Sequence, residues 1–155
     1  MRTPDRIPEG FIKFPTDSPY FKNAGPFFFK RDGDNYSMGF VASDRHMRHP
    51  TLVAGGALFI LADIAQGHAI ATAIWTDLEE LKANGYRLVT IRLNTDCISS
   101  RAWGDWIQAD VTVTRIGSNV AFSRAVISTK EKVLMTSNAT YTVRPATHTD
   151  TPTAC

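Results

Sequence analysis

Between residues 54 and 75 the chain carries its longest apolar run, with hydrophobic or small residues on every side at helical spacing. A surface helix has a hydrophobic stripe on one side only, so a helix that is apolar nearly all round is enclosed by other structure. The pattern therefore predicts a long buried helix from about Ala54 to Trp75. Polar residues resume at Thr76–Lys82, and Asn84-Gly85 closes the segment.

The rest of the chain predicts strands joined by turns. Hydrophobic and polar residues alternate there, as in a strand with one buried face. The expected strands cover residues 27–31, 36–41, 86–96, 106–115, 120–129 and 133–144. The last four follow one another closely and predict an antiparallel meander. Because one all-apolar helix is hidden only if the sheet curls round it, we predict an α+β fold: a curled antiparallel β-sheet wrapped around one long central α-helix.

Three regions are expected along the chain. Residues 1–26 are rich in proline and aromatic residues and predict an N-terminal arm with a short helix near Ser18–Lys22. Residues 27–145 form the domain, in which residues 42–50 are a polar loop before the long helix. Residues 146–155 are rich in threonine and proline and predict a flexible C-terminal tail. No internal repeat and no second domain are evident.

Composition narrows the class of protein. The 155 residues suit one domain, and 43% hydrophobic with 21% charged residues indicate an ordinary globular protein. A net charge of +2 lacks the concentrated basic stripe of a nucleic-acid-binding protein. Cys97 and Cys155 form no disulfide or metal-binding pattern, and no apolar segment follows Met1–Arg6, so we expect a cytoplasmic protein.

Asp63 interrupts the apolar helix near its middle. An aspartate at a bilayer centre costs at least about 2.5 kcal/mol, which favours burial in protein over a membrane span. A buried carboxylate must be paired or hydrogen-bonded, and burial raises its pKa toward the value of a general base. Asp63 is therefore a candidate catalytic residue. The alternative is a structural aspartate paired with an arginine or histidine, such as Arg48, at a subunit contact.

Gly55 and Gly56 lie at the expected start of the same helix. The first N–H groups of a helix have no partner within it, and the helix dipole favours negative charge there. Such donors can stabilise the oxyanion that forms when a thioester carbonyl is attacked, and glycine lets the reacting group approach the backbone closely. The alternative is that both glycines only allow close packing of helix against sheet.

Other polar residues near this helix give weaker signals. Gln66 lies one turn beyond the helix carboxylate and could orient it or a water molecule, or make an interface hydrogen bond. His68 lies off that side and is expected to be a core or interface histidine. His46, His49 and Asp44 precede the helix, but the chain has no helical pair of histidines and no cysteine ligands, so we expect no metal.

The segment from His46 through Gly55-Gly56 to Asp63 resembles a motif of the hotdog-fold acyl-CoA thioesterases of the phenylacetic-acid-degradation type. That family's pattern is close to H-x-N-x-x-G-x-x-H-G-G, with an aspartate seven residues after the second paired glycine. Three positions depart from it: Arg48 stands for asparagine, Thr51 for glycine and Ala54 for histidine. The resemblance covers roughly residues 10–144 and includes the aromatic arm.

The resemblance implies hydrolysis of an acyl-CoA thioester, with no cofactor beyond the coenzyme A of the substrate. It implies that Gly55 and Gly56 bind the oxyanion and that Asp63 is the base or the nucleophile. Thr90 stands where some relatives carry a serine or threonine near the aspartate. Further substrate contacts are expected from five residues: His46, Arg48, Gln66, Arg115 and Ser118. Arg115 and Ser118, at the predicted hairpin, would meet the coenzyme A phosphates or are simple turn residues.

Two other functions remain open for the same fold. An acyl-CoA hydratase or dehydratase usually needs a histidine paired with an acidic residue, and no histidine here is convincingly placed for that. A non-catalytic acyl-CoA-binding or structural protein would account for the three departures from the motif.

The spacing of Gly55 and Asp63 also predicts an assembly. Eight residues separate them, which is roughly 12 Å along one helix. A base and an oxyanion donor must both lie close to one thioester, so one straight helix cannot supply both. Two helices related by a two-fold axis can, and the resemblance implies sites built from two subunits. We expect a homodimer or homotetramer, without a nucleic-acid or membrane partner.

Overall fold

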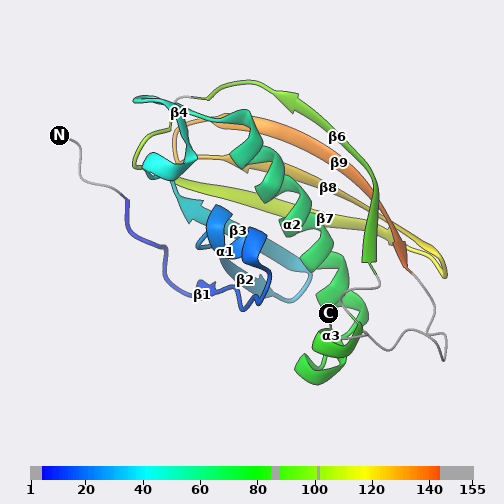
Figure 1. Cartoon of the computed structure of the whole chain (residues 1–155). Coiled ribbons are helices and arrows are strands. Elements are labelled where there is room, and N and C mark those ends of the chain that lie inside the picture. The colour runs from blue at the N-terminus through cyan, green and yellow to red at the C-terminus, as the bar shows by residue number, and fades with distance from the viewer. Residues whose placement is uncertain (1–4, 85–87, 101, 144–155) are drawn as a thin grey trace.

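A computed structural model describes residues 5–84, 88–100 and 102–143. The 20-residue helix α2 (Gly55–Ile74) lies across the concave face of a seven-stranded antiparallel sheet (Figure 1). The strand order in this sheet is β1-β2-β3-β7-β8-β9-β6. The bounds of these strands are β1 Ile12–Lys13, β2 Phe28–Asp32, β3 Asn35–Val41, β6 Leu88–Cys97, β7 Trp106–Ile116, β8 Val120–Ser128 and β9 Val133–Val143. The predicted α+β architecture, a curled sheet around one long helix, is confirmed.

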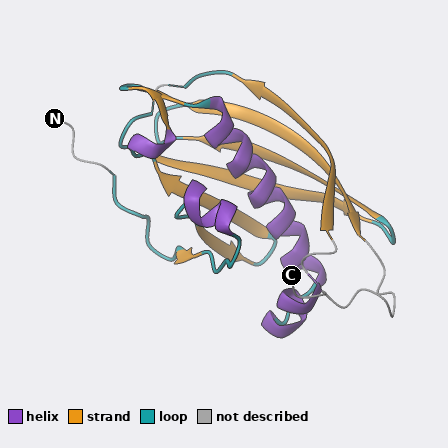
Figure 2. Cartoon of the chain, viewed as in Figure 1, coloured by secondary structure: helices purple, strands orange, loops and turns teal. Residues whose placement is uncertain are grey.

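The shorter elements lie around the two ends of α2. Before it come a 3₁₀ turn (Asp44–His46) and a small two-stranded ribbon of β4 (Met47–His49) and β5 (Leu52–Val53). Helix α3 (Leu78–Asn84) follows it. Figure 2 shows these helices, together with α1 (Pro19–Ala24), on one face of the large sheet.

Alternating side chains explain how the sheet covers α2. In β8, alternate residues from Ala121 to Ile127 are buried, and the residues between them are exposed. On the helix, Ala62, Ala65 and Ala69 are completely buried. Their small side chains let the sheet approach the helix axis closely. By length and composition α2 could cross a membrane, but its burial against the sheet accounts for its apolar character.

The predicted four-strand meander is wrong in its order, although its strands are antiparallel. β6 pairs with β9 along residues 88–97 and not with β7, so it forms an edge of the sheet. The connection from β6 to β7 has eight residues, 98–105, which is longer than a tight hairpin turn. It runs past the beginning of α2, where the Val53 N–H donates to the Ser100 carbonyl at 2.7 Å.

The segment expected as a loop before α2, and the polar segment that follows α2, both contain regular structure. Residues 42–50 include the 3₁₀ turn and β4, because β4 pairs with β5. The Ala54 N–H, just after β5, donates to the His46 carbonyl, just before β4, at 2.8 Å. Helix α3 begins after Asp77, whose Oδ1 accepts hydrogen bonds from the N–H groups of Glu79 at 2.7 Å and Glu80 at 3.2 Å. An N-cap aspartate with two glutamates in the first helical turn is a helix-start signal that the hydrophobic pattern alone does not reveal.

The N-terminal arm lies against the body of the protein. The Phe14 N–H donates to the Phe27 carbonyl at 2.9 Å, and the Phe11 ring meets the Trp106 ring edge-on with centroids 5.0 Å apart. The expected short helix is α1, whose N-cap Ser18 accepts a hydrogen bond from a backbone N–H. The predicted tail, residues 146–155, lies outside the described residues.

Replacing Gly39 with alanine is expected to destabilise the fold by about 1–3 kcal/mol, because cores respond to inserted volume with strain. An added Cβ would lie 2.4 Å from the Ile107 carbonyl oxygen and 2.5 Å from the Trp106 ring. Gly56→Ala is the control, since its Cβ would meet no atom within 4 Å and helical alanine is favoured by up to about 1 kcal/mol. Urea denaturation of both variants measures the difference; equal stabilities would contradict the packing argument.

Candidate active site

Asp63 lies on the partly exposed side of α2, where two hydroxyl groups hold its carboxylate. The Thr90 hydroxyl, from β6, donates to Oδ1 at 2.8 Å. The Tyr141 hydroxyl, from β9, is 3.1 Å from the same oxygen and donates to the Asp63 backbone carbonyl at 2.7 Å. Both side-chain contacts involve Oδ1, which leaves Oδ2 available to another partner. The structure thus places Thr90 beside Asp63, where the resemblance expected it.

Tyr141 is the residue of this cluster that sequence reasoning missed. Burial, together with the adjacent Asp63 charge, raises the pKa of Tyr141 far above its ordinary value, so its hydroxyl remains a donor. Tyr141 is the cross-strand partner of Thr90 in the β6–β9 ladder. Its ring also passes within 3.3 Å of the position that a Cβ at Gly67 would occupy. Only the true strand order, with β6 beside β9, reveals this cluster.

A groove of about 760 Å³ opens in front of the carboxylate. One wall is the side of α2 that carries Asp63, and the opposite wall is the N-terminal arm. The lining residues are Phe14, Pro15, Thr16, Asp17, Ser18, Phe21, Asp63, Ile64, Gly67, His68, Ala71, Leu81, Leu88, Thr90 and Tyr141. The groove combines a polar cluster at Asp63 with largely apolar and aromatic walls. This is the usual composition of a small-molecule site.

Gly55 and Gly56 form the first turn of α2. The N-cap Ala54 offers no side-chain acceptor, so helix-end N–H groups remain for a ligand. A Cβ at either glycine would meet nothing within 4 Å. Close packing within this chain therefore does not explain the two glycines, and open space above the helix start agrees with a donor role.

Gln66 is not a substrate-binding residue in this structure, contrary to the prediction. Its side chain is completely buried under the sheet. Its amide nitrogen donates to the Ala62 carbonyl at 3.0 Å and to the Ser137 hydroxyl at 2.9 Å, and its oxygen accepts from Ser123 at 3.0 Å. Both amide hydrogens are used inside the core, so none is left for a substrate or an interface.

His46 is also wrong as a substrate-binding residue. It is buried, with Nε2 2.9 Å from the Ala24 carbonyl and Nδ1 accepting from the Ser43 N–H at 3.1 Å. Burial is the main cause that lowers the pKa of His46, so the ring stays neutral and donates from Nε2. The ring joins the arm to the turn before α2.

Arg48 does not pair with Asp63. Its side chain is exposed on β4, near the beginning of α2, whereas Asp63 lies two turns inside the helix. Among the described residues, no ion pair joins the two. The alternative raised for Asp63, a pairing with Arg48 at a subunit contact, concerns two chains and stays a prediction.

Arg115 and Ser118 lie at the end of β7 and in the turn that leads to β8. Figure 1 shows this hairpin at the end of the sheet where α2 finishes, remote from the helix start. Both residues are exposed. Within one chain they do not join Gly55, so their contact with coenzyme A stays a prediction.

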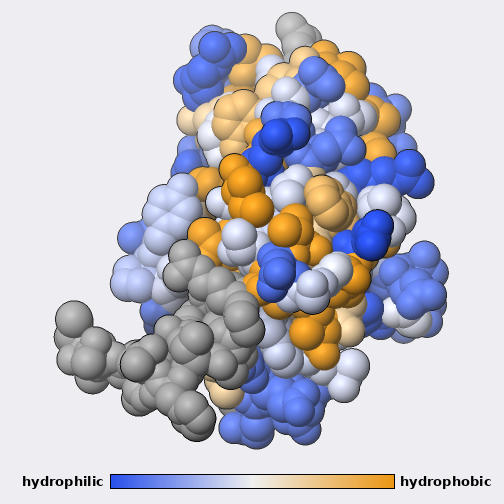
Figure 3. Space-filling model, turned by 90° about the vertical axis from the view of Figure 1, so that its right-hand side faces the viewer, coloured by the Kyte–Doolittle hydropathy of each residue, from blue (hydrophilic) through white to orange (hydrophobic). Residues whose placement is uncertain are grey.

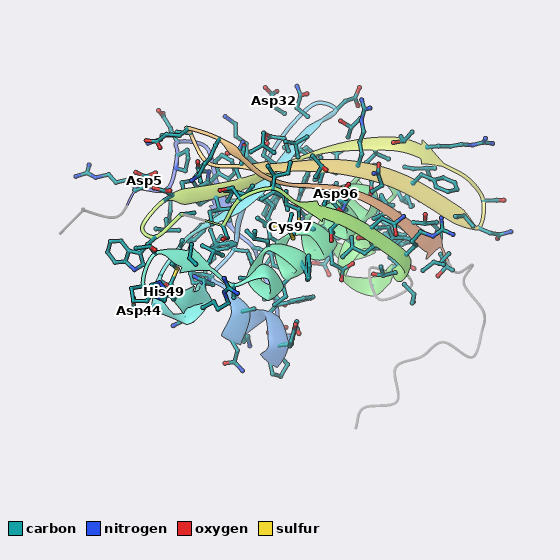
Figure 4. All side chains as sticks on the ribbon, turned by 90° about the horizontal axis from the view of Figure 1, so that it is seen from above. Asp5, Asp32, Asp44, His49, Asp96 and Cys97 are labelled. Atoms are coloured by element: carbon teal, nitrogen blue, oxygen red, sulfur yellow. The ribbon has the colours of Figure 1, made fainter. Side chains whose placement is uncertain are left out.

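Asp44, His46 and His49, the residues considered for a metal site, lie in the short segment before α2. Figure 4 shows Asp44 and His49 beside the ribbon that precedes α2, and Asp96 and Cys97 on β6. Across residues 5–84, 88–100 and 102–143, no three histidine, cysteine, aspartate or glutamate side chains gather closely enough to hold a metal ion.

His68 lies within an aromatic cluster on the other side of α2. Its Nδ1 bonds to the Tyr36 hydroxyl, and its ring meets those of Phe14 and Phe29 edge-on, each with centroids 4.9 Å apart. Burial, assisted by the charge of Arg31, lowers the pKa of His68 to about 4. The expectation of a core histidine is met by these contacts, although the ring also reaches the groove.

The lowered pKa of His68 predicts acid sensitivity. In the unfolded chain, His68 becomes protonated below about pH 6.5. In the folded protein, the same ring stays neutral until the pH reaches about 4. The contribution of His68 to the free energy of unfolding is therefore fully present above about pH 6.5. It decreases by up to about 3 kcal/mol as the pH drops to 4. His68→Gln keeps a polar partner for Tyr36 and should flatten this slope. Denaturation midpoints between pH 4 and 7 measure it; identical slopes in both proteins would contradict the assignment.

Sequence comparison relates the chain to one protein family and to one curated protein. A sequence profile of the thioesterase superfamily matches residues 51–136. A curated Pseudomonas aeruginosa protein named "Putative esterase PA0474" is 26% identical over 136 residues, which make up 87% of this chain and 96% of that protein.

Solved structures share the fold at low sequence identity. Zebrafish thioesterase superfamily member 2 has a TM-score of 0.67 at 17% identity, and covers 83% of this chain and 89% of its own. The E. coli PaaI protein from the phenylacetic acid degradation operon has a TM-score of 0.66 at 17% identity, with 84% and 88% covered. Together with the profile match to more than half of its length, these findings show that the chain belongs to the thioesterase superfamily and has the hotdog fold.

Proposed function

We propose that this protein hydrolyses an acyl-CoA thioester to a free acid and coenzyme A. The observation that carries the proposal is the Asp63 carboxylate, held by two hydroxyl groups at the wall of the groove. Membership of the thioesterase superfamily and the esterase name of the P. aeruginosa relative support hydrolysis in general. The motif resemblance implies coenzyme A as the leaving group.

In the proposed mechanism Asp63 is the general base. Thr90 and Tyr141 occupy Oδ1, so Oδ2 can accept a proton from a water molecule in the groove. The water oxygen attacks the carbonyl carbon, and N–H groups at the start of an α2 helix stabilise the oxyanion. When the tetrahedral intermediate collapses, the carbon–sulfur bond breaks and the proton on Asp63 passes to the departing thiolate. The mechanism needs no cofactor apart from the coenzyme A of the substrate.

The site is proposed to be shared by two subunits of a homodimer or homotetramer. Gly55 and Asp63 of one α2 lie roughly 12 Å apart along the axis, too far to reach one carbonyl. A second α2, antiparallel to the first about a two-fold axis, would bring its beginning beside Asp63. Close approach is feasible near the helix start because Gly56 is exposed and has no side chain.

Exposed apolar side chains support such an interface. Phe59, on α2, is 42% exposed, and Ile91, on β6, is 55% exposed. β6 is also an edge strand whose outer side pairs with no described strand. On the side of the molecule where β6 and β9 end, Figure 3 shows exposed hydrophobic residues interspersed with hydrophilic ones. Large exposed apolar side chains beside an unpaired strand edge are features of interaction sites.

The two alternatives are less well supported. A hydratase or dehydratase would need a histidine beside the carboxylate, whereas His46 bonds to backbone and His68 to Tyr36. A non-catalytic binding protein would still need a groove, but not a carboxylate prepared by two donors. A cytoplasmic location is part of the proposal, because Cys97 and Cys155 form no disulfide pattern in the sequence.

Asp63→Asn should lower kcat by about 10²–10⁴-fold, because the amide preserves shape but cannot accept a proton. The measurement is thiol release from a panel of acyl-CoA substrates by the purified protein. Asp110→Asn, on the outer face of the sheet where Asp110 bonds to Ser37, is the matched control and should keep full activity. Wild-type protein that binds a non-hydrolysable acyl-CoA thioether without hydrolysing any acyl-CoA would favour the non-catalytic alternative.

Two inactive variants should restore activity when their subunits mix. Gly55→Pro removes one N–H but suits the first position of a helix, and Ala54 already has the extended backbone that precedes proline. Combined with Asp63→Asn, it gives hybrid dimers with one doubly defective site and one intact site. Up to about a quarter of the wild-type activity is expected if subunits pair at random, because half of the dimers then carry one intact site of two.

Subunit exchange must be verified by mass spectrometry of differently tagged chains. If hybrid dimers form and remain inactive, the shared site is wrong while Asp63 can still be the base. Each variant mixed with itself is the control and should stay inactive.

A further inference from the structure

One polar atom in the groove has no part in the proposed mechanism. His68 lines the groove, and its Nδ1 is occupied by the Tyr36 hydroxyl. No other described residue bonds to the remaining nitrogen, Nε2. A buried nitrogen without a partner would be costly, but Nε2 is not enclosed in the protein. It therefore reaches the groove that the ring lines.

The hydrogen bond to Tyr36 decides which nitrogen carries the proton. Tyr36 is buried, and burial raises the pKa of its hydroxyl well above the ordinary value, so the phenol keeps its proton. Among the described residues, His68 Nδ1 is the acceptor that this hydroxyl has. When the phenol donates to Nδ1 of a neutral ring, the ring proton must lie on Nε2. The groove therefore contains a fixed, uncharged N–H donor.

The Nε2–H donor of His68 lies at a distance from Asp63, where the thioester is proposed to react. His68 is five residues beyond Asp63, roughly 7.5 Å along α2, and on the side of the helix that faces β2 and the arm. Between the two lie Gly67 and Ile64, which offer no side-chain polar atom. Phe14, across the groove, packs on the His68 ring and limits its rotation.

We propose that His68 is a specificity-determining residue, which selects acyl groups that carry an oxygen acceptor several bonds away from the thioester. The inference rests on the proposed hydrolysis of acyl-CoA. The thioester carbonyl lies at Asp63, the acyl chain follows the apolar surface of α2, and a hydroxyl or carbonyl oxygen of the acyl group accepts the Nε2 proton. Because the donor is neutral, its hydrogen bond does not require a charged acceptor, and an uncharged hydroxyl or carbonyl oxygen suffices.

The test compares pairs of substrates that differ in one oxygen. Butanoyl-, hexanoyl- and octanoyl-CoA are compared with their terminally hydroxylated analogues, and kcat/KM is measured for each. Wild-type protein should prefer one hydroxylated analogue by about two- to tenfold relative to the trend of the plain chains, the range for one neutral hydrogen bond. The preferred length reports the distance from Asp63 to His68.

Three variants separate recognition from folding. His68→Phe should remove the preference while leaving kcat for the plain chains within about twofold. His68→Phe leaves the buried Tyr36 hydroxyl without its partner, which can impair folding. The double variant Tyr36→Phe/His68→Phe removes that hydroxyl as well and should show the same loss of preference. His68→Gln retains a side-chain N–H donor and should recover part of the preference.

The outcomes distinguish this inference from the proposed function. Hydrolysis with the same hydroxyl preference in wild type and His68→Phe, or with no preference in wild type, overturns the role of His68 and leaves the thioesterase standing. If no substrate is hydrolysed, the proposed hydrolysis fails. In that case, dissociation constants of thioether analogues with and without the hydroxyl are compared between wild type and His68→Phe. If no analogue binds, the role of His68 is overturned as well.

Discussion

Hydrogen bonds from Gln66 fix how α2 lies on the sheet. One amide contacts a serine of β8 and a serine of β9 at once, so the helix can neither rotate nor slide without losing a buried hydrogen bond. Ala62 and Ala65 on the same side bring the helix close enough for these contacts. Asp63, three residues before Gln66, is thereby held at the level of Thr90 and Tyr141. A polar contact inside the core thus sets the geometry of the candidate site outside it.

The sequence reveals the long helix and the candidate base because both depend on local pattern. A 20-residue apolar helix interrupted by one carboxylate is visible without any knowledge of its neighbours. Thr90 is found through the family resemblance. Tyr141 is not found, because its nearness to Asp63 depends on β6 pairing with β9, and strand order is set by long-range packing across the sheet.

The errors at Gln66 and His46 have another cause. A polar residue near a candidate site has two ways to satisfy its hydrogen bonds, with a ligand or with buried groups of the protein. Sequence does not separate them, since the serines that meet Gln66 are 57 and 71 residues away. His46 likewise bonds to Ala24, which belongs to the arm. Both side chains stabilise the framework that carries the site.

The edge position of β6 gives the site a mechanical weakness. One of the two hydroxyl groups on Asp63 belongs to a strand that is hydrogen-bonded along one side only, and such edges open locally more readily than central strands. When β6 opens, Thr90 loses its hydrogen bond to Asp63, whereas Tyr141, on the interior strand β9, keeps its contact. Amide hydrogen exchange should thus be faster in β6 than in β9 of an isolated subunit. Any surface that covers this edge would slow the exchange and preserve the alignment of the carboxylate.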